Sequence, residues 1–369
     1  MAKNNKGAVA MNSLDANGRV IGRGDMVDLT RGTFTMTDEY GKVHTMDLGQ
    51  SDVHIEKALA NYAAGYRLQQ GQADMVSPVL PASMASDKFF TWDKNDAFQP
   101  VQDIESAPGA AVKEVNPRLS NTLFATVNYA VGAFIPTEVI ANADSPLQPQ
   151  INAMRRCMNV LLQQREQRVA NLLTTAANFD PSVVQTTPAA NKWDGGASSN
   201  PIADIFYILE RSLQPVTHMV MNERVWHAFI ANAQVQKYTQ AKFNVPGLPG
   251  QPTDIQGTNA LLGLPTILVA AMKGLSNAGI YDYIWGNDVA LVHQEPNPPS
   301  DGQTIATSFT FRWAGGNPQD AQMQGGFTVR SFFNQFRGPR GGTQIVVTHN
   351  DAEVLTSNIV GGVLKAVWQ

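Results

Sequence analysis

Residues 145–178 constrain the fold more than any other stretch because they have the pattern of one long helix. Ser145 is a good N-cap, and Pro146 stands at the first helical position, where a missing N–H is tolerated. Pro149 would still fall in the first turn. About 30 residues at 1.5 Å each predict a rod of roughly 45 Å, either a structural spine or half of a helical hairpin. The apolar residues recur mostly at three- and four-residue steps: Leu147, Ile151, Met154, Met158, Leu161, Leu162, Val169, Leu172, Leu173 and Ala176.

Three different kinds of segment precede this stretch. Residues 1–50 are polar, rich in glycine and weakly patterned, so they cannot bury a core of their own. We expect neighbouring subunits to hold them. Residues 51–70 carry apolar side chains at helical spacing, which predicts a helix. Residues 75–92 contain two prolines among apolar residues, which predicts extended chain at the edge of a sheet.

Residues 93–130 have an unusual pattern. The part from 93 to 109 is charged and contains proline and glycine turn signals. Residues 120–129 then have the composition of a strand. The pattern predicts a long two-stranded excursion away from the body of the protein. An ordinary surface loop with a hairpin is the alternative.

The second half of the chain alternates between helix and strand signals. Asn200 followed by Pro201 predicts the start of one helix, and Asn222 predicts the start of another. A polar stretch that begins at His349 is expected to separate the last two strands. This half is therefore expected to be α+β. Its predicted strands are 216–221, 265–271, 280–285, 289–292, 308–313, 327–333, 343–348 and 359–368.

The charge content limits the classes of partner. Charged residues make up 16% of the chain, against about a quarter in an average soluble protein. Such a surface suits a protein that buries much of itself against its own copies, although a neutral globular protein is an alternative. The net charge of −4 argues against a dedicated nucleic-acid binder. The apolar runs are too short to span a bilayer, and no signal peptide is evident, so no membrane partner is expected.

No pattern in the sequence predicts catalysis, a metal site or a cofactor. The six histidines have no metal-ligand spacing, and we expect His227 to be partly buried and structural. The glycine-rich run 338–342 lacks the residues of a phosphate-binding loop and predicts a turn between strands. Cys157 lies in the apolar helix, which predicts a buried thiol. Four carboxylates that could pair, but that nothing brings into one site, are Asp204, Glu210, Asp282 and Asp288. The prediction is a protein that is not an enzyme, with no catalytic, cofactor-binding or metal-binding residues.

Four segments, taken in their order and spacing, resemble one family. The chain is similar to the major capsid proteins of tailed bacteriophages, which share the Hong Kong 97-like fold, from about residue 50 to the C-terminus. The segments are NKWDGGASSNPIADI at 191–205, REQRVANLLTTAANF at 165–179, HMVMN at 218–222 and IWGNDV at 284–289.

The resemblance implies an α+β fold with a specific domain map. The excursion would be the extended E-loop, which lies on a neighbouring subunit, and the long helix would be the spine of the peripheral domain. The implied map is an N-terminal arm at 1–50, the start of the peripheral domain at 51–87, the E-loop at 88–130, the peripheral domain with spine helix 145–178 at 131–199, the axial domain at 200–335, and the closing strands of the peripheral domain at 336–369.

The resemblance also implies a function and partners. The chain would assemble into hexamers and pentamers that form an icosahedral head around double-stranded DNA, which it would contact without sequence specificity. Portal and scaffolding proteins, and a decoration protein, would be further partners. The location would be the virion head, after assembly in the bacterial cytoplasm. Cross-linking lysines cannot be assigned, although Lys88, Lys94 and Lys113 lie in or near the excursion. The alternatives are an encapsulin-type nanocompartment shell, a minor virion or decoration protein, and a soluble α+β enzyme.

Overall fold

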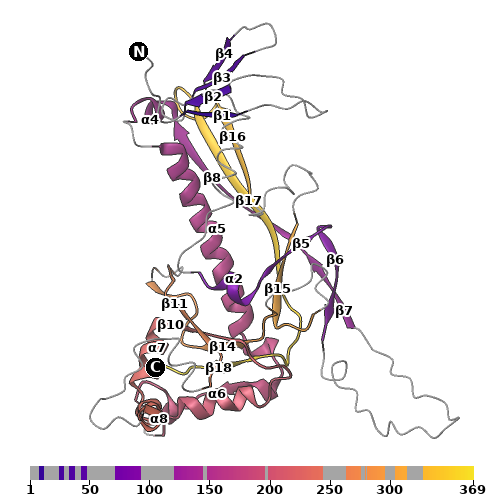
Figure 1. The fold of residues 1–369 in the computed structure, drawn as a ribbon, viewed down its shortest axis with the longest axis vertical. Coiled ribbons are helices and arrows are strands. Elements are labelled where there is room, and N and C mark those ends of the chain that lie inside the picture. Colours follow the sequence, from indigo (N-terminus) through magenta and orange to yellow (C-terminus); the bar gives the residue numbers. More distant parts are fainter. Residues whose placement is uncertain are drawn as a thin grey trace, which may run out of the picture. The chain divides into compact units, whose positions relative to one another are not determined.

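In the computed structural model (Figure 1), the chain forms two compact units. Unit 1 contains Met1–Tyr66, Ala130–Met158 and Met323–Thr348, and unit 2 contains Arg67–Tyr129, Asn159–Gln322 and His349–Gln369. The helix predicted at 51–70 and residues 93–119 of the excursion lie outside the described residues. The structure describes residues 8–11, 25–28, 33–37, 43–47, 71–92, 120–143, 148–195, 198–243, 263–275, 279, 281–295, 304–313 and 327–369.

The N-terminal part of unit 1 contains a small antiparallel sheet. Its four strands follow one another in chain order: β1 (Ala8–Met11), β2 (Asp25–Asp28), β3 (Thr33–Thr37) and β4 (Val43–Asp47). The weak sequence pattern of residues 1–50 did not predict these strands.

The long predicted helix exists but is shorter at both ends. Helix α5 spans Pro149–Thr174, so Pro149 is its first residue rather than a member of an earlier turn. A helix that began at Pro146 would lose a backbone hydrogen bond at Pro149, because proline has no N–H. The C-terminal end of α5 lies where a side chain takes the place of a backbone donor. The Asn178 Nδ2 donates to the Leu172 carbonyl at 2.7 Å. Residues Ala176–Asn178 form the separate 3-10 turn η1.

Unit 1 also contains a hairpin that ends in a glycine-rich turn. Strand β16 (Thr328–Asn334) pairs antiparallel with the first half of β17 (Gly342–Leu355), from Asn334 opposite Gly342 to Thr328 opposite Thr348. The residues between them form the turn that the sequence predicted. Strand β8 (Val127–Pro136) also pairs with β17 and leads into the short helix α4 (Thr137–Ala141).

A five-stranded mixed sheet forms the centre of unit 2. Its order is β11 (Thr266–Ala270), β10 (His218–Asn222), β14 (Val289–Val292), β18 (Gly362–Lys365) and β9 (Val184–Thr186). The smaller strands β12 (Lys273–Leu275) and β13 (Tyr281–Tyr283) pair separately, and η2 (Pro181–Val183) and η3 (Ala189–Asn191) flank β9.

Alternate residues of this sheet enter two different cores. On β10, Met219 and Met221 pack with helices α6 (Pro201–Leu209), α7 (Glu223–Ala231) and α8 (Ala233–Phe243). Val220 points to the other face and packs with Val169 and Leu173 of α5. The sheet is therefore buried on both faces, which explains why every residue of β14 is buried.

Both predicted caps in this region are confirmed. The Asn200 side chain accepts a hydrogen bond from the Ala203 N–H at 3.3 Å, with Pro201 at the first helical position of α6. The Asn222 side chain accepts one from the Val225 N–H at 2.7 Å at the start of α7. In both cases a local side chain satisfies a helix N–H that has no partner within the helix.

The rest of unit 2 contains a second sheet and a hairpin. Strand β15 (Ser308–Trp313) lies between the second half of β17 and β5 (Val79–Ala82), which is at the edge as its proline requires. The preceding residues Ala73–Val76 form the short helix α2, where extended chain was predicted. The polar stretch predicted from His349 is wrong, because β17 continues through it to Leu355.

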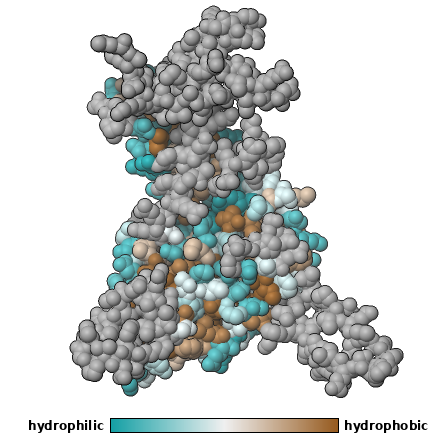
Figure 2. Space-filling model, viewed as in Figure 1, coloured by the Kyte–Doolittle hydropathy of each residue, from teal (hydrophilic) through white to brown (hydrophobic). Residues whose placement is uncertain are grey.

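In the view of Figure 2, hydrophobic and hydrophilic residues alternate in small patches over the described surface. No helix among the described residues has the length and apolar character needed to cross a membrane. The mixture of helices and strands confirms the predicted α+β class.

Candidate functional site

A two-stranded hairpin in unit 2 is anchored by aromatic rings at its base. Strands β6 (Ser86–Thr91) and β7 (Ser120–Ala125) pair antiparallel along their full length. Phe124 of β7 stacks on Phe311 of β15 with ring centroids 4.4 Å apart, and Phe89 of β6 lies 5.8 Å from the same ring. These rings form one buried cluster, which fixes the direction in which the hairpin leaves the sheet.

The outer side of the hairpin leaves apolar side chains in water. Leu123, beside the buried Phe124, is 71% exposed because successive strand residues face opposite sides. Met84 before β6 and Val127 after β7 are also largely exposed. Exposed apolar residues grouped on one element are typical of a surface that contacts another chain.

A buried network of charges joins α5 to the second sheet. Arg165 of α5 is 2% exposed, donates to the Ser77 carbonyl at 3.1 Å and forms an ion pair with Asp74. Arg312 of β15 donates two hydrogen bonds, of 2.6 and 2.7 Å, to Asp351 of β17. Burial raises the pKa of the Asp351 carboxyl, but the hydrogen bonds and charge of Arg312 outweigh it and hold that pKa below its usual value.

A second part of this network surrounds a buried histidine. The His349 ring packs edge-on against the Tyr129 ring at 5.5 Å, and its Nε2 lies 3.8 Å from an Asp351 oxygen. Arg168 lies 3.7 Å above the same tyrosine ring and donates to Glu353 at 2.7 Å. Burial lowers the pKa of His349 to about 4, with the nearby arginines adding to the effect and Asp351 opposing it.

Glu166, the neighbour of Arg165, holds a different segment against α5. Its carboxylate accepts hydrogen bonds from the backbone N–H groups of Gln72 and Ala73, at 3.0 and 2.8 Å, and from the Trp285 indole at 2.6 Å. Burial raises the pKa of Glu166, while these hydrogen bonds and the Arg165 charge oppose the rise. The carboxylate thus ties the start of α2 and the turn after β13 to the long helix.

These buried charges hold elements together and do not form a catalytic arrangement. Each of these carboxylates has arginine, indole or backbone donors around it, so it holds neighbouring segments in place. Among the described residues, no group of three or more histidine, cysteine, aspartate or glutamate side chains could hold a metal ion. The network therefore fixes α5, β15 and β17 of unit 2 in one arrangement.

The four carboxylates that the sequence analysis considered as possible pairs do not meet in the structure. The Asp204 Oδ2 accepts from the buried Trp193 indole at 3.0 Å, Asp282 from Arg224 at 2.9 Å, and Asp288 pairs with Lys365. Glu210 is exposed at the end of α6. Three of the four have their own basic or indole partner, so no carboxylate pair for acid–base chemistry is formed.

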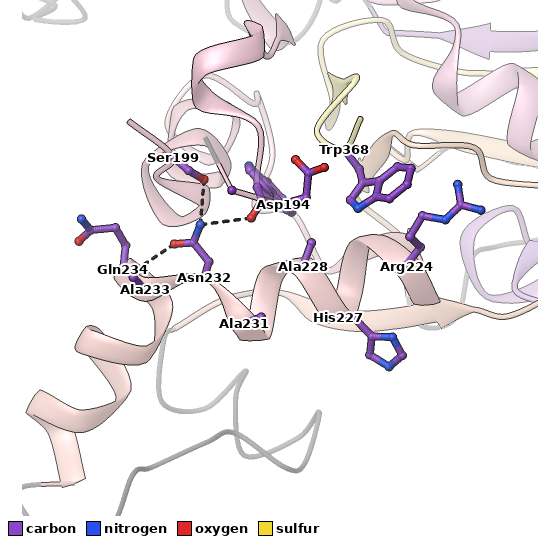
Figure 3. Close-up of a pocket in the computed structure, with 12 residues that line it drawn as sticks. Asp194, Ser199, Arg224, His227, Ala228, Ala231, Asn232, Ala233, Gln234 and Trp368 are labelled. Atoms are coloured by element: carbon purple, nitrogen blue, oxygen red, sulfur yellow. Dashed lines mark hydrogen bonds between the residues drawn. The ribbon is translucent and has the colours of Figure 1, made fainter. Parts of the chain in front are cut away.

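Two further expectations have opposite outcomes. Cys157 is buried as predicted, and burial raises the pKa of its thiol. The prediction of a partly buried His227 is wrong, because its side chain is exposed on α7 and points away from the helix (Figure 3). Val225, Trp226, Ala228 and Phe229 fill the buried face of this helix instead.

His227 lies at the rim of a pocket of about 550 Å³ in unit 2 (Figure 3). Alanines of α7 and α8 form part of its lining, with Trp368 and Arg224 at one end and Asn232 at the other. The Asn232 amide donates to Ser199 Oγ at 2.8 Å and to the Trp193 carbonyl at 3.4 Å, so it ties the loop after Trp193 to the junction of α7 and α8. Arg224 lies 4.5 Å from the Trp368 ring and is already paired with Asp282, so the arginine of this lining has its own carboxylate partner.

The charge network is the feature that sequence reasoning missed. Arg165 lies four residues after Leu161 and four before Val169, both of which are buried. An arginine within an apolar stripe was the available signal that a buried carboxylate faces it.

Among the comparisons with known proteins, the one with solved structures gives matches. No family model matches the sequence, and no curated protein matches it. A phage-related protein from Bordetella bronchiseptica has a TM-score of 0.63 at 16% identity, over 84% of this chain and 96% of that chain. A prophage capsid protein from E. coli CFT073 has a TM-score of 0.51 at 12% identity, over 85% and 99%. The capsid of cyanophage P-SCSP1u gives 0.51 at 11% identity, over 82% and 89%.

The chain has the fold of phage capsid proteins. The capsid fold includes parts of both units, because unit 2 alone is smaller than the matched share of the chain. The predicted Hong Kong 97-like fold is thereby confirmed.

Proposed function

We propose that this chain is the major capsid protein of a tailed bacteriophage, a structural protein without catalytic activity. It assembles into hexamers and pentamers that form an icosahedral head around double-stranded DNA. The observation that carries the proposal is the capsid fold, which extends over 82–85% of this chain and 89–99% of two solved capsid chains. Because one fold can host different functions, the test of the proposal is whether the purified chain assembles.

The described structure supports the domain map as part of this proposal. Residues 88–130 act as the E-loop: the hairpin is held at its base by Phe124 and presents Leu123 to a neighbouring subunit. Residues 1–50 act as the N-terminal arm and 51–87 begin the peripheral domain. Helix α5 is the spine of the peripheral domain at 131–199, residues 200–335 form the axial domain, and 336–369 supply the closing strands.

The buried charges support a structural role for the spine helix α5. Arg165, Glu166 and Arg168 attach one stretch of α5 to three other segments of unit 2. Fixed geometry within a subunit lets the same contacts repeat at every position of a closed shell. The low charge content lowers the repulsion among many packed copies.

The other partners follow from the role of a head protein. The chain would contact packaged DNA without sequence specificity, through a few basic side chains rather than a basic stripe, in keeping with its net charge of −4. Scaffolding and portal proteins would act during assembly in the bacterial cytoplasm, and a decoration protein would bind the finished virion head.

Electron microscopy of the purified full-length chain tests the proposal. The expected result is uniform hollow icosahedra, or tubes built of hexamers. A monodisperse monomer that never assembles at high concentration would refute a self-assembling shell. Particles from infected cells that hold cargo enzyme and no genome would favour an encapsulin-type shell, and a low copy number per virion would favour a minor or decoration protein.

A further inference from the structure

The turn at 335–341, between β16 and β17, has a backbone that several contacts hold in place. The Asn334 side chain accepts a hydrogen bond from the Phe336 N–H at 3.1 Å. Gly341 has a φ of +70°, and a Cβ there would lie 2.7 Å from the Phe333 ring, so the chain passes directly beneath that ring. The next residue, Gly342, is packed equally closely against Phe134 of β8. The turn is therefore preorganised.

The same turn is attached to helix α4. The Thr137 N–H donates to the Gly341 carbonyl at 3.2 Å, and the Thr137 hydroxyl donates to it at 3.1 Å. The Arg340 Nε lies 3.9 Å from a Glu138 oxygen. Arg337 lies 4.9 Å from the centre of the Phe134 ring. The turn and α4 thus form one structural piece within unit 1.

The turn and the adjoining end of β16 nevertheless expose three phenylalanines. Phe336 is 90% exposed, Phe333 is 57% exposed and Phe332 is 45% exposed. Phe332 and Phe333 follow one another on a strand and so face opposite sides, while Phe336 lies beyond its end. Apolar surface therefore covers both sides and the end of the projection. Such a projection suits insertion into a partner more than flat contact along one side.

The charged residues within the turn and its two flanking strand ends are all arginines. Residues 328–346 contain Arg330, Arg337 and Arg340 but no lysine, aspartate or glutamate. Aromatic residues and arginine are enriched at the centres of protein interfaces, where lysine and carboxylates are depleted. A DNA duplex would offer phosphates to the arginines, but its apolar base faces are stacked against one another and must be separated to admit a ring, so a protein partner fits three phenylalanines better.

A recess of suitable chemistry lies on α4 and the start of α5 in the same unit. Its volume is about 510 Å³, and Val139 in its wall is 50% exposed. Glu138 supplies a carboxylate, which also approaches Arg340 of the turn, so the recess and the turn adjoin. The lining residues are Glu138, Val139, Asn142, Ala143, Pro149 and Asn152.

We propose that Phe336 of one copy inserts into this recess of a second copy, with Arg337 facing Glu138 of that copy. The apolar ring meets an apolar wall, and the arginine meets the recess carboxylate. A projection and a recess at different places on one surface make a heterologous contact, which closes into a ring when copies are related by rotation. The inference rests on the proposed function and names a contact between neighbouring subunits that the shell would use.

A disulfide between two separately expressed variants tests the contact. Phe336→Cys and Val139→Cys chains are mixed, assembled and oxidised, and then run on a non-reducing denaturing gel. A Phe336→Cys to Val139→Cys disulfide formed in this mixture can only join two copies, and the native Cys157 is buried. The expected result is covalent dimers in the mixed particles and none in particles of either variant alone. Absence of dimers in mixed particles, or dimers of Phe336→Cys alone, would overturn the assignment.

The substitution Phe336→Ala, which removes the ring, distinguishes failure of this inference from failure of the proposed function. Because Phe336 is almost fully exposed, Phe336→Ala should leave the melting temperature of the unassembled subunit unchanged. It should raise the protein concentration needed for assembly by about tenfold or more. If the natural chain forms particles and Phe336→Ala assembles equally well, the inference fails while the shell function stands. Normal assembly with loss of bound nucleic acid would also overturn it, in favour of a DNA contact. If the natural chain itself forms no particles, the proposed function fails first.

Discussion

Arg312 on β15 donates two hydrogen bonds, of 2.6 and 2.7 Å, to Asp351, its direct partner across the sheet on β17. Arg165 of α5 also approaches this carboxylate, at 3.9 Å. Asp351 has no exposed side-chain surface, and it is the hydrogen-bonded carboxylate of Arg312 and a second carboxylate for Arg165 beside Asp74.

Replacement of Asp351 by alanine is therefore expected to destabilise the subunit strongly. The change leaves the Arg312 and Arg165 charges buried without their shared carboxylate, which costs about 3–5 kcal/mol. Urea denaturation of the unassembled subunit, followed by circular dichroism, measures the free energy of unfolding.

Asp282→Ala is the matched control for this experiment. Asp282 pairs with Arg224 at 2.9 Å, but its side chain is 52% exposed. Exposed ion pairs contribute about 0–1 kcal/mol, so this variant should stay close to the natural protein. Equal losses for the two aspartates would contradict the role given to the buried pair.

The buried His349 predicts a loss of stability in mild acid. Its pKa falls from 6.5 to about 4 on folding, so between these values the unfolded chain binds the proton more readily than the folded one. The stability that the neutral ring contributes is present above pH 6.5 and is lost as the pH falls toward 4. At about 1.4 kcal/mol per pH unit, the loss amounts to roughly 3 kcal/mol.

Denaturation midpoints measured from pH 7.5 to 4 check this dependence. The His349→Gln variant should show a flatter profile over that range, whatever its stability at pH 7.5. His227→Gln alters an exposed histidine on α7 and should keep the natural slope. A natural slope in the His349→Gln variant would assign the acid sensitivity to other groups.

Two glycines with positive φ should respond very differently to alanine. At Gly361, φ is +84° and a Cβ would lie 2.2 Å from the Leu291 carbonyl oxygen, with backbone on that side. At Gly286, φ is +59° and no atom lies within 4 Å of the Cβ position. Gly286→Ala should cost about 1–2 kcal/mol from backbone strain alone. Gly361→Ala adds a steric clash and should cost about 3 kcal/mol or more.

The melting temperatures of the two variants measure this contrast. Both substitutions place alanine at a positive φ, but only the Cβ of Gly361→Ala meets a neighbouring strand. A similar fall in melting temperature for both would show that β14 yields easily at Leu291. That outcome would contradict the tight packing of the central sheet.

Structural features that depend on residues close together in the sequence could be predicted, as the two helix caps show. Asn200 bonds to the N–H three residues later, and so does Asn222. The continuous strand β17 was missed because its polar residues are stabilised from afar. Asp351 meets Arg312, 39 residues away, and no local pattern records that pairing.

The same reasoning explains the errors at the candidate site. Arg165 lies at helical spacing from the buried Leu161 and Val169, but only the fold brings Asp74 and Asp351 to it. The capsid fold was predicted from the order of short segments rather than from any single motif. The domain map derived from that resemblance remains a prediction, and the hairpin at its E-loop gives a direct way to examine it.

We expect the buried Phe124 ring to hold the β6–β7 hairpin in its direction. Its ring stacks on Phe311 at 4.4 Å and lies 6.4 Å from Phe89, so Phe124→Ala removes the centre of the buried cluster. Loss of a buried phenylalanine costs about 3–5 kcal/mol, and an isolated two-stranded hairpin is only marginally stable in water. The hairpin should therefore open locally while the central sheet of unit 2 stays closed. Faster amide hydrogen exchange confined to 86–91 and 120–125 is the expected signature.

Leu123→Ala provides the control, because Leu123 is the next residue on the same strand but is 71% exposed. It should leave hydrogen exchange in the subunit unchanged, since most of the side chain is exposed to solvent. If the hairpin lies on a neighbouring subunit as proposed, this variant should still weaken assembly. Phe124→Ala should weaken assembly as well, but through a hairpin that no longer points toward its neighbour. Faster exchange in Leu123→Ala, or unaltered exchange in Phe124→Ala, would contradict the anchoring of the hairpin by its buried rings.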